Sequence, residues 1–497
     1  MKRIKEKEPA KLNYFFKGGY VELLNTIKTS FGKLGNNISD AWFEVTNNFS
    51  FFWKTFWPAI GGIFSLEFNW DDFGYAIASI CKFSFALGKL LCVLVITTTL
   101  TLIFSLLHIA ILFPIMLLAY AAYFVLLALD GLYCAAKSIS SNCPNPDCQS
   151  HFMLPEYVCP SCKKRHKSLR PGRYGIWKRT CECGNKLPTT FFNGRQKLEA
   201  YCPHCNTAVK DGGKHRDICI PVVGGPSSGK TCFINTAISE IEKLAPDNRL
   251  DFRYSPNTND EYEVNVRRIR SGELPVKTYD TRLKYYQFYL TPEKKKLKTL
   301  VSLCDVAGEL FSSDAKIGTQ IGYRYANAFI LIIDPLSITD YRNKLSRITR
   351  VVDYNYSSAE IDETLDVLVN TLENMYCITA KDMLKTDVAV VFAKCDIPDL
   401  VNKIGEEAVR EYIEFHPGTS ETDAQNAVCE AFLSEYGESN FLKSLRSKFK
   451  TVRFFLSSSL GHNKNGTPFV SSGVHLPVLW LLNRITGSGE YGKAMKG

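Results

Sequence analysis

A stretch of 40 residues in this sequence lacks every Asp, Glu, Lys and Arg side chain. It runs from residue 90 to residue 129, between Lys89 and Asp130, and most of its side chains are apolar. Buried helices of soluble domains rarely continue so far without a charge, whereas a helix that crosses a bilayer needs only about 20 apolar residues. The missing charges therefore exclude a water-exposed segment and predict one that lies in a membrane.

The uncharged stretch is long enough to cross a bilayer twice. We expect a transmembrane helical hairpin within residues 89–136, with helices over 90–107 and 111–129 and a turn near His108 and Pro114. Lysine residues flank both ends, so the positive-inside rule predicts that the N- and C-terminal portions of the chain are both cytoplasmic. One long kinked helix and a hairpin confined to one leaflet are the alternatives, and a single span would put the two chain ends on opposite sides.

The N-terminal region lacks the early apolar run of a secretory signal peptide and begins with charged residues. Residues 1–88 are instead rich in aromatic side chains, and between Val21 and Leu34 apolar residues recur every three or four positions, as on one face of a helix. Amphipathic, aromatic-rich helices beside a membrane segment suit the lipid headgroup layer. We therefore expect an interfacial helical region, with a small helical domain that has an ordinary core as the alternative.

Eight of the 17 cysteines fall in close pairs, which argues for a reducing cytosol and against secreted disulfides. Two of these pairs have the C-P-x-C spelling of zinc-ribbon knuckles, and four thiolates from two pairs suit tetrahedral Zn²⁺. Residues 137–216 are thus predicted to hold two zinc-ribbon motifs, formed by Cys143, Cys148, Cys159 and Cys162 and by Cys181, Cys183, Cys202 and Cys205. Pairing within each set is the simpler choice and a crossed arrangement is the other. Iron–sulfur clusters and disulfides are the alternatives to zinc.

The net charge of +10 comes mainly from one segment, since residues 137–217 carry 15 basic and 6 acidic side chains. Two Zn(Cys)₄ centres, each with a net charge of about −2, would reduce this surplus to about +5. The remaining basic side chains suit an anionic partner. Because the segment follows the membrane stretch directly, the lipid bilayer is the nearer partner. Nucleic acid is an alternative that is not favoured, and a solvated surface without a specific partner fits equally well.

Residues 224–231 fit the phosphate-binding loop pattern G-x-x-x-x-G-K-[ST] at every fixed position. Glycines let the backbone curl so that its N–H groups point at phosphate oxygens. The apolar run 218–223 before the loop is predicted to be a buried strand, although Pro221 is unusual there, and the helix expected at 232–244 would favour an anion at its N-terminus. The predicted nucleotide-binding residues are Gly224, Gly225, Pro226, Ser227, Ser228, Gly229, Lys230, Thr231 and Cys232. Lys230 would reach the β- and γ-phosphates, and the Thr231 hydroxyl would bind Mg²⁺.

Alternating strands and helices from residue 217 onward predict an α/β domain with a mostly parallel sheet and helices on both faces. Further strands are expected at 284–290, 299–304, 328–333, 388–392 and 452–456. The second of these ends at the D-x-x-G sequence Asp305-Val306-Ala307-Gly308-Glu309. There Asp305 would hold Mg²⁺ through water, and the Gly308 N–H would contact the γ-phosphate.

These motifs, in this order at strand ends, resemble the P-loop GTPases of the Ras-like and translation-factor class over residues 217–487. The resemblance implies that Lys394 lies along the base and that the Asp396 carboxylate accepts hydrogen bonds from guanine, which favours GTP over ATP. Ala393 departs from the family's N-K-x-D pattern, because it stands where that pattern has Asn. Ser458 is implied to lie in the loop that contacts the base from the other side.

The same resemblance implies a catalytic set that joins Thr278 and Glu309 to Lys230, Thr231, Asp305 and Gly308. A switch threonine should precede the strand at 284–290, with Thr278 as first choice and Thr281 as second. Glu309 stands where Ras-like proteins have a water-orienting Gln. Its negative charge would repel the γ-phosphate, so slow intrinsic hydrolysis is expected.

The order of membrane segment, cysteine motifs and GTPase domain also resembles bacterial membrane-tethered members of the double-GTPase group, associated with conflict and defence gene clusters. The Asp334-Pro335 and Asp305-x-Ala307-Gly308-Glu309 spellings add to this resemblance. We expect a membrane-anchored GTPase switch that uses GTP, Mg²⁺ and two Zn²⁺ ions.

A protein effector or activator would recognise the switch. The insertion 341–387 is a candidate surface for it, and an amphipathic helix is expected there near 361–376 whose apolar stripe could instead pack on the domain itself. A non-enzymatic membrane scaffold with a structural nucleotide, and a nucleic-acid sensor coupled to an NTPase, are the alternative functions. Residues 488–497 are expected to be a flexible tail.

Overall fold

The computed structural model describes residues 8–16, 18–65, 69–145, 148, 150–209, 214–255, 260–271, 273, 275, 284–305, 325–346, 356–375, 378–460 and 470–495. By its internal contacts the chain divides into two compact units. The first comprises residues 1–132 and 169–195, and the second comprises residues 133–168 and 196–497.

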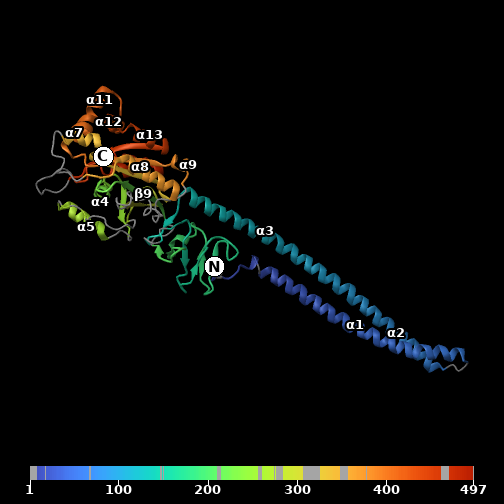
Figure 1. Ribbon diagram of the computed structural model, residues 1–497. Helices are drawn as coiled ribbons and strands as arrows, with labels where there is room; N and C mark the ends of the chain where they lie inside the picture. Colours follow the sequence, from blue (N-terminus) through green and yellow to red (C-terminus); the bar gives the residue numbers. More distant parts are fainter. Residues whose placement is uncertain are drawn as a thin grey trace. The chain divides into compact units, whose positions relative to one another are not determined.

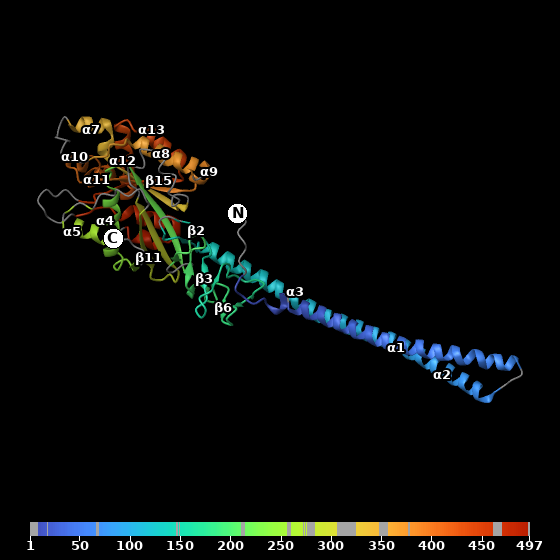
Figure 2. The ribbon, with the colours of Figure 1, turned by 60° about the horizontal axis from the view of Figure 1, so that its bottom comes forward.

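Long helices make up most of the first unit. They are α1 (Gly18–Phe64), α2 (Trp70–Cys92) and α3 (Thr98–Ala136), and the short helix η1 (Tyr14–Phe16) precedes them. The rings of Phe49 and Phe83 lie 5.5 Å apart, and the Lys89 ammonium lies 2.6 Å from the Glu44 carboxylate. From the first of these contacts to the second, the residue number falls along α1 and rises along α2. The two helices therefore run antiparallel (Figures 1 and 2).

The uncharged stretch forms one helix, so the predicted hairpin is not confirmed. α2, the π-helical segment η2 (Val93–Thr97) and α3 follow one another directly, and residues 70–136 are helical throughout. His108 and Pro114, where a turn was expected, lie inside α3. A proline alone bends a helix without reversing it, and residues 90–129 contain no glycine to start a turn.

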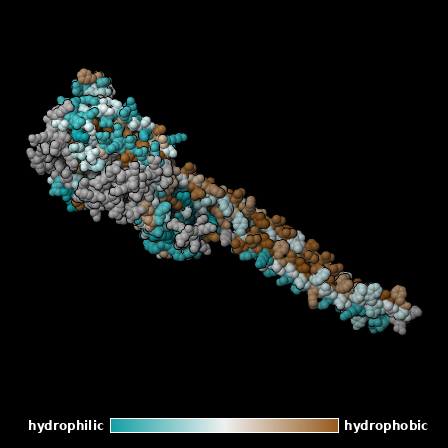
Figure 3. Space-filling model, viewed as in Figure 1, coloured by the Kyte–Doolittle hydropathy of each residue, from teal (hydrophilic) through white to brown (hydrophobic). Residues whose placement is uncertain are grey.

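This continuous helix is long and apolar enough to cross a membrane. Most of its large apolar side chains are exposed, and they form a band along the helix in the space-filling view (Figure 3). Length and composition support a membrane span here but do not determine on which side the ends of the chain lie.

A seven-stranded sheet forms the centre of the second unit, in the order β10-β11-β12-β9-β13-β14-β15. Its strands are β9 (His215–Gly224), β10 (Leu250–Tyr254), β11 (Lys284–Pro292), β12 (Lys298–Asp305), β13 (Ala328–Ile333), β14 (Asp387–Phe392) and β15 (Thr451–Leu456). Pairing is parallel from β12 through β15 and antiparallel for β10 with β11 and β11 with β12. All six predicted strands are present, and β10 is an additional strand at the edge.

Helices cover both faces of this sheet, as predicted. One face packs on α4 (Lys230–Leu244) and α14 (Leu476–Thr486), and the other packs on α7 (Thr339–Ser346), α8 (Ile361–Asn370), α10 (Pro398–Ile404), α12 (Glu421–Glu435) and α13 (Ser439–Lys448). Among the described residues, the same two cores also include side chains from α5 (Asp260–Arg270), α9 (Ala380–Met383), α11 (Glu406–Phe415) and α15 (Gly489–Lys493), and from the short segments η6 (Pro335–Ser337) and η8 (Thr371–Met375). Leu365 and Leu368 of α8 are buried, so its apolar stripe packs on the domain itself.

The C-terminal residues differ from the expected flexible tail. Within 488–497, α15 is helical, and its Tyr491 is buried. The Tyr491 hydroxyl donates a 2.8 Å hydrogen bond to the Leu290 carbonyl of β11. This bond anchors the end of the chain to the sheet.

Short antiparallel strands organise the cysteine-rich residues. In the second unit, β1 (Ser141–Asn142) pairs with β2 (His151–Phe152), and β3 (Glu156–Val158), β4 (Arg165–His166), β7 (Ala200–Tyr201) and β8 (Ala208–Val209) form a sheet in the order β4-β3-β7-β8. In the first unit, β5 (Lys178–Thr180) pairs with β6 (Lys186–Pro188). There the buried Arg195 guanidinium lies 2.8 Å from the buried Asp130 carboxylate, which ties the end of α3 to the residues after β6.

Candidate functional site

The phosphate-loop motif connects the end of β9 to the start of α4. Gly229 has φ +97°, a conformation that favours glycine. A Cβ atom on Gly224 would lie 2.8 Å from the Ile332 carbonyl oxygen, and one on Gly225 would lie 2.3 Å from Ser357 Oγ. Side chains at these positions would clash with their neighbours, so the glycines of the motif permit both the turn and the close packing around it.

The Lys230 side chain turns back into the loop that precedes it. Its Nζ donates 2.8 Å hydrogen bonds to the carbonyl oxygens of Gly224 and Gly225. Burial lowers the pKa of Lys230 to about 8, although the nearby Asp305 carboxylate acts in the opposite direction. A weakly solvated cation held at the start of a helix suits the binding of phosphate oxygens.

The two predicted magnesium ligands lie side by side. Thr231 Oγ1 donates a 2.7 Å hydrogen bond to Asp305 Oδ2. The sheet explains this contact, because Asp305 ends β12 and β12 pairs in parallel with β9, which leads into the loop. Hydroxyl and carboxylate oxygens are the ligands that Mg²⁺ prefers, so these two residues fit the ion.

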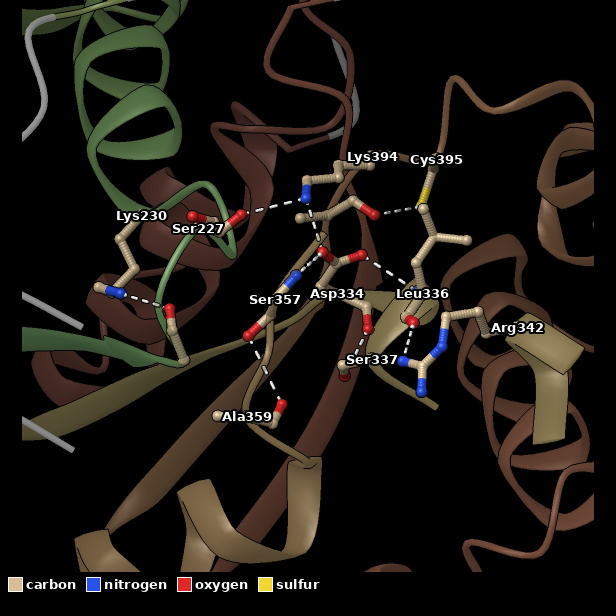
Figure 4. A network of polar contacts seen from close by, with 12 residues as sticks. Ser227, Lys230, Asp334, Leu336, Ser337, Arg342, Ser357, Ala359, Lys394 and Cys395 are labelled. Carbon is tan, nitrogen blue, oxygen red and sulfur yellow. Dashed lines mark hydrogen bonds and ion pairs between the residues drawn. The ribbon is translucent and has the colours of Figure 1, made fainter. Parts of the chain in front are cut away.

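The predicted base motif is tied to the phosphate loop. Lys394 Nζ donates a 3.1 Å hydrogen bond to the Ser227 carbonyl oxygen and lies 2.6 Å from Asp334 Oδ2 (Figure 4). Asp334 follows β13, and its carboxylate is fully buried. The Asp334-Pro335 spelling adds to the family resemblance but predicts no role for Asp334. The signal in the sequence was its position at the end of a buried strand, which places it at the same sheet edge as the loop but does not identify its partners.

Two residues predicted to flank the base also lie together. Ser458 Oγ donates a 2.8 Å hydrogen bond to Asp396 Oδ1, and Ser458 forms an antiparallel bridge with Ser472. Ala393, in the place of the expected Asn, is buried, and its backbone N–H donates to the Ile333 carbonyl. The loop therefore takes its predicted place at the end of β14 without a polar side chain at that position.

Two further residues of the predicted nucleotide site are the buried Ser228 and the half-buried Cys232. The Ser228 hydroxyl is buried and finds no hydrogen-bond partner among the described residues. Burial raises the pKa of Cys232 to about 11, against the opposing charge of Lys394. The Cys232 thiol therefore stays protonated at neutral pH and is suited to packing rather than to nucleophilic attack.

The remaining predicted catalytic residues lie outside the described part of the chain. They are Thr278 and its alternative Thr281, together with Gly308 and Glu309 of the D-x-x-G sequence. Their assigned roles stay predictions.

The eight cysteines group differently from the simpler prediction. Cys143 and Cys148 lie with Cys202 and Cys205 in the second unit, which leaves Cys159, Cys162, Cys181 and Cys183 as the other predicted ligands. Pairing of Cys143 and Cys148 within their consecutive set is therefore wrong, and these two residues follow the crossed arrangement. Strand pairing explains this grouping. β3 and β7 are antiparallel with Tyr201 opposite Glu156, so Cys202 lies beside the start of β3, on the side of the chain that comes from Cys148.

The group in the second unit has the dimensions of a four-thiolate metal site. Its sulfurs all lie within 4.8 Å of one another. Cys143 Sγ is 3.3 Å from Cys205 Sγ, and Cys148 Sγ is 3.9 Å from Cys202 Sγ. Four sulfurs at about 2.3 Å from a tetrahedral zinc ion are about 3.8 Å apart. This cluster thus has a donor set that suits Zn²⁺.

Comparison with known proteins places the nucleotide site in a family. No curated protein matches the chain. The family model described as Double-GTPase 2 matches residues 218–458. This range begins in β9 and includes the phosphate loop, Asp305, Asp334 and Asp396. Over these residues the chain carries a domain of the double-GTPase group, within the P-loop GTPase class.

Proposed function

We propose that this protein is a membrane-anchored GTPase whose bound nucleotide acts as a conformational switch. The observation that carries the proposal is the meeting of Lys230, Thr231 and Asp305 at the ends of adjacent parallel strands. A loop that binds phosphate, two oxygen ligands for Mg²⁺ and a guanine-type carboxylate then belong to one site. The family match supports nucleotide binding of this class.

The residues of the chain would divide the work of GTP hydrolysis. Lys230 and the N-terminus of α4 would bind the β- and γ-phosphates, and Thr231 and Asp305 would hold Mg²⁺, which neutralises phosphate charge when bound. Asp396 would select guanine. Thr278, Gly308 and Glu309 would respond to the γ-phosphate, and the negative charge of Glu309 predicts slow turnover without an activator.

The other parts of the chain would place this switch at a bilayer and stabilise its cysteine-rich region. The apolar helix over residues 70–136 supports membrane anchoring, and the two cysteine clusters support zinc sites that stabilise segments too small to form a core. An effector or activator protein would recognise the nucleotide state. The cysteine-rich region would serve as an interaction module.

The guanine assignment is tested by nucleotide preference in the detergent-solubilised chain. Wild type should hydrolyse GTP and not ATP, and Lys230→Ala should abolish that activity. Asp396→Asn replaces a hydrogen-bond acceptor with a donor toward the base, so it should shift preference from GTP to the xanthine nucleotide by at least about tenfold. GTP hydrolysis that survives Lys230→Ala, or an unchanged base preference in Asp396→Asn, would refute the proposal.

A further inference from the structure

Asp334 accepts hydrogen bonds from three separate segments of the nucleotide domain. Oδ1 accepts from the Leu336 N–H at 3.1 Å, and Oδ2 accepts from the Ser357 N–H at 2.8 Å and from Lys394 Nζ at 2.6 Å. Its carboxylate is fully buried, whereas the Lys394 side chain is one-quarter exposed. The convergence is visible in Figure 4, in which the Asp334 carboxylate lies between Ser357 and Lys394. A buried carboxylate with this many donors is held in one position.

The bond to Lys394 extends the contact to the phosphate loop. Lys394 has φ +58°, an uncommon conformation for a residue with a side chain, and its ammonium also reaches the Ser227 carbonyl oxygen. Ala393 offers no polar side chain that could hold this turn. The Asp334 carboxylate therefore connects this turn to the end of β13 through a side-chain contact, whereas Ala393 makes no such contact.

The bond to Ser357 links the same carboxylate to the residues before α8. Ser357 is buried, and its hydroxyl lies so close to Gly225 that a Cβ on that glycine would be 2.3 Å away. Ala359, two residues on, would lie 3.1 Å from the same Cβ. The segment that leads into α8 thus packs directly on the phosphate loop, and Asp334 holds its backbone there.

We propose that Asp334 is a positioning residue that sets how fast bound nucleotide dissociates. It fixes the Lys394 side chain beside the phosphate loop and at the same time holds the segment at Ser357 against Gly225. Displacement of the segment before α8 would weaken both contacts, so this segment regulates nucleotide release through Asp334. The inference rests on the proposed function, because it requires nucleotide at this site.

Dissociation of a fluorescent GDP analogue from the full chain in detergent tests this role. Asp334→Asn keeps the shape of the side chain and removes the charge that pairs with Lys394. Loss of a charge-assisted hydrogen bond predicts dissociation about 10- to 100-fold faster. Asp366→Asn, at an exposed position on α8, should dissociate at the wild-type rate.

A double-mutant cycle separates positioning from a general loss of structure. In a Lys394→Met background, Asp334→Asn should have much less effect, because its partner is already gone. The GTP-to-xanthine preference should also stay at the wild-type value in Asp334→Asn. Thermal unfolding of each variant shows whether it has folded. If Asp334→Asn fails to fold, Asp334→Glu replaces it, because this variant keeps the charge. Asp334→Glu should then change the dissociation rate less than Lys394→Met does.

The outcomes distinguish this inference from the function on which it rests. A wild-type chain that binds the GDP analogue, with dissociation unchanged in Asp334→Asn or equally accelerated in both backgrounds, overturns the role of Asp334 alone. A wild-type chain that prefers an adenine nucleotide overturns the guanine assignment, and the same cycle is then measured with that nucleotide. A wild-type chain that binds neither nucleotide overturns both proposals.

Discussion

At the scale of single residues, Lys230 is a buried side chain that carries a positive charge when protonated. The side chain is buried, and its ammonium is held by two carbonyl oxygens of its own loop, so water contributes little to its solvation. Burial lowers the pKa to about 8, below the ordinary lysine value of 10.5. The protonated form that attracts phosphate is therefore the main form only below about pH 8.

This lowered pKa predicts a pH dependence of nucleotide affinity. Below pH 8 Lys230 already carries its proton, and affinity should change little on its account. Above pH 8 binding must take up a proton, so affinity should fall by up to about tenfold per pH unit. Titration calorimetry with GTP between pH 7 and pH 9.5 measures this slope, and the protons taken up can be read from buffers of different ionisation enthalpy.

Two variants separate Lys230 from other titrating groups. Lys230→Met should bind weakly and lose the added slope above pH 8. Lys243→Met, at an exposed position on the same helix, should keep the wild-type slope. An identical slope in wild type and Lys230→Met would assign the pH dependence to another group.

At the scale of secondary-structure elements, the sequence predicted the strands well because each is a short apolar run next to a recognisable motif. β10 escaped prediction because its Leu-Asp-Phe-Arg-Tyr sequence mixes charges with apolar residues and lies at the sheet edge. The continuous helix through His108 was only an alternative to the predicted hairpin, for the opposite reason. A uniform apolar run predicts where a chain meets lipid, but it carries no signal for where the chain turns.

The candidate site, like the fold, could be predicted only in part from the sequence. Motif spacing identified Lys230, Thr231 and Asp305, since parallel strand ends bring such residues together. The role of Asp334 depends on its contacts with Lys394 and Ser357, which are distant in sequence, so spacing could not reveal it. Cysteine spacing likewise identifies ligands but does not determine which pairs share a metal.

The crossed grouping of the cysteines predicts an unusual pattern of zinc loss. Wild type should hold about two zinc ions per chain. Cys143→Ser with Cys205→Ser removes two ligands of one cluster, so about one ion should remain. Cys143→Ser with Cys162→Ser removes one ligand from each cluster, and both ions should be lost or strongly weakened. Metal analysis of the purified full chain counts the ions.

Pairing within consecutive sets predicts the reverse outcome for these two double variants. Cys429→Ser serves as the matched control, because this buried cysteine lies on α12 and belongs to neither cluster. It should leave the zinc content at the wild-type value. Retention of one ion in the Cys143/Cys162 variant and of none in the Cys143/Cys205 variant would contradict the crossed grouping.

At the scale of the whole molecule, the continuous helix changes where the chain would cross a membrane. A span within residues 70–136 puts Ser65, just before it, and Lys137, just after it, on opposite sides. The N-terminal residues instead lie with residues that follow the helix, because the Lys11 N–H donates a 2.9 Å hydrogen bond to the Thr180 carbonyl. We therefore expect Ser65→Cys to react with an impermeant maleimide from outside intact cells and Lys137→Cys to react only in inverted vesicles. Both positions are tested with Cys81, Cys92 and Cys134 replaced by serine. Reaction of both from the same side would favour the hairpin.

The length of this helix has a consequence for the lipid around it. The 40 uncharged residues span about 60 Å as a helix, whereas the hydrocarbon layer is about 30 Å thick. The usual helix tilt of about 20° shortens the helix along the bilayer normal by too little to remove this excess. A span formed by this whole stretch would be mismatched to an ordinary bilayer, and a thicker membrane would cover more of it. Membrane thickness, and not only membrane charge, would then affect how stable this protein is in a given membrane.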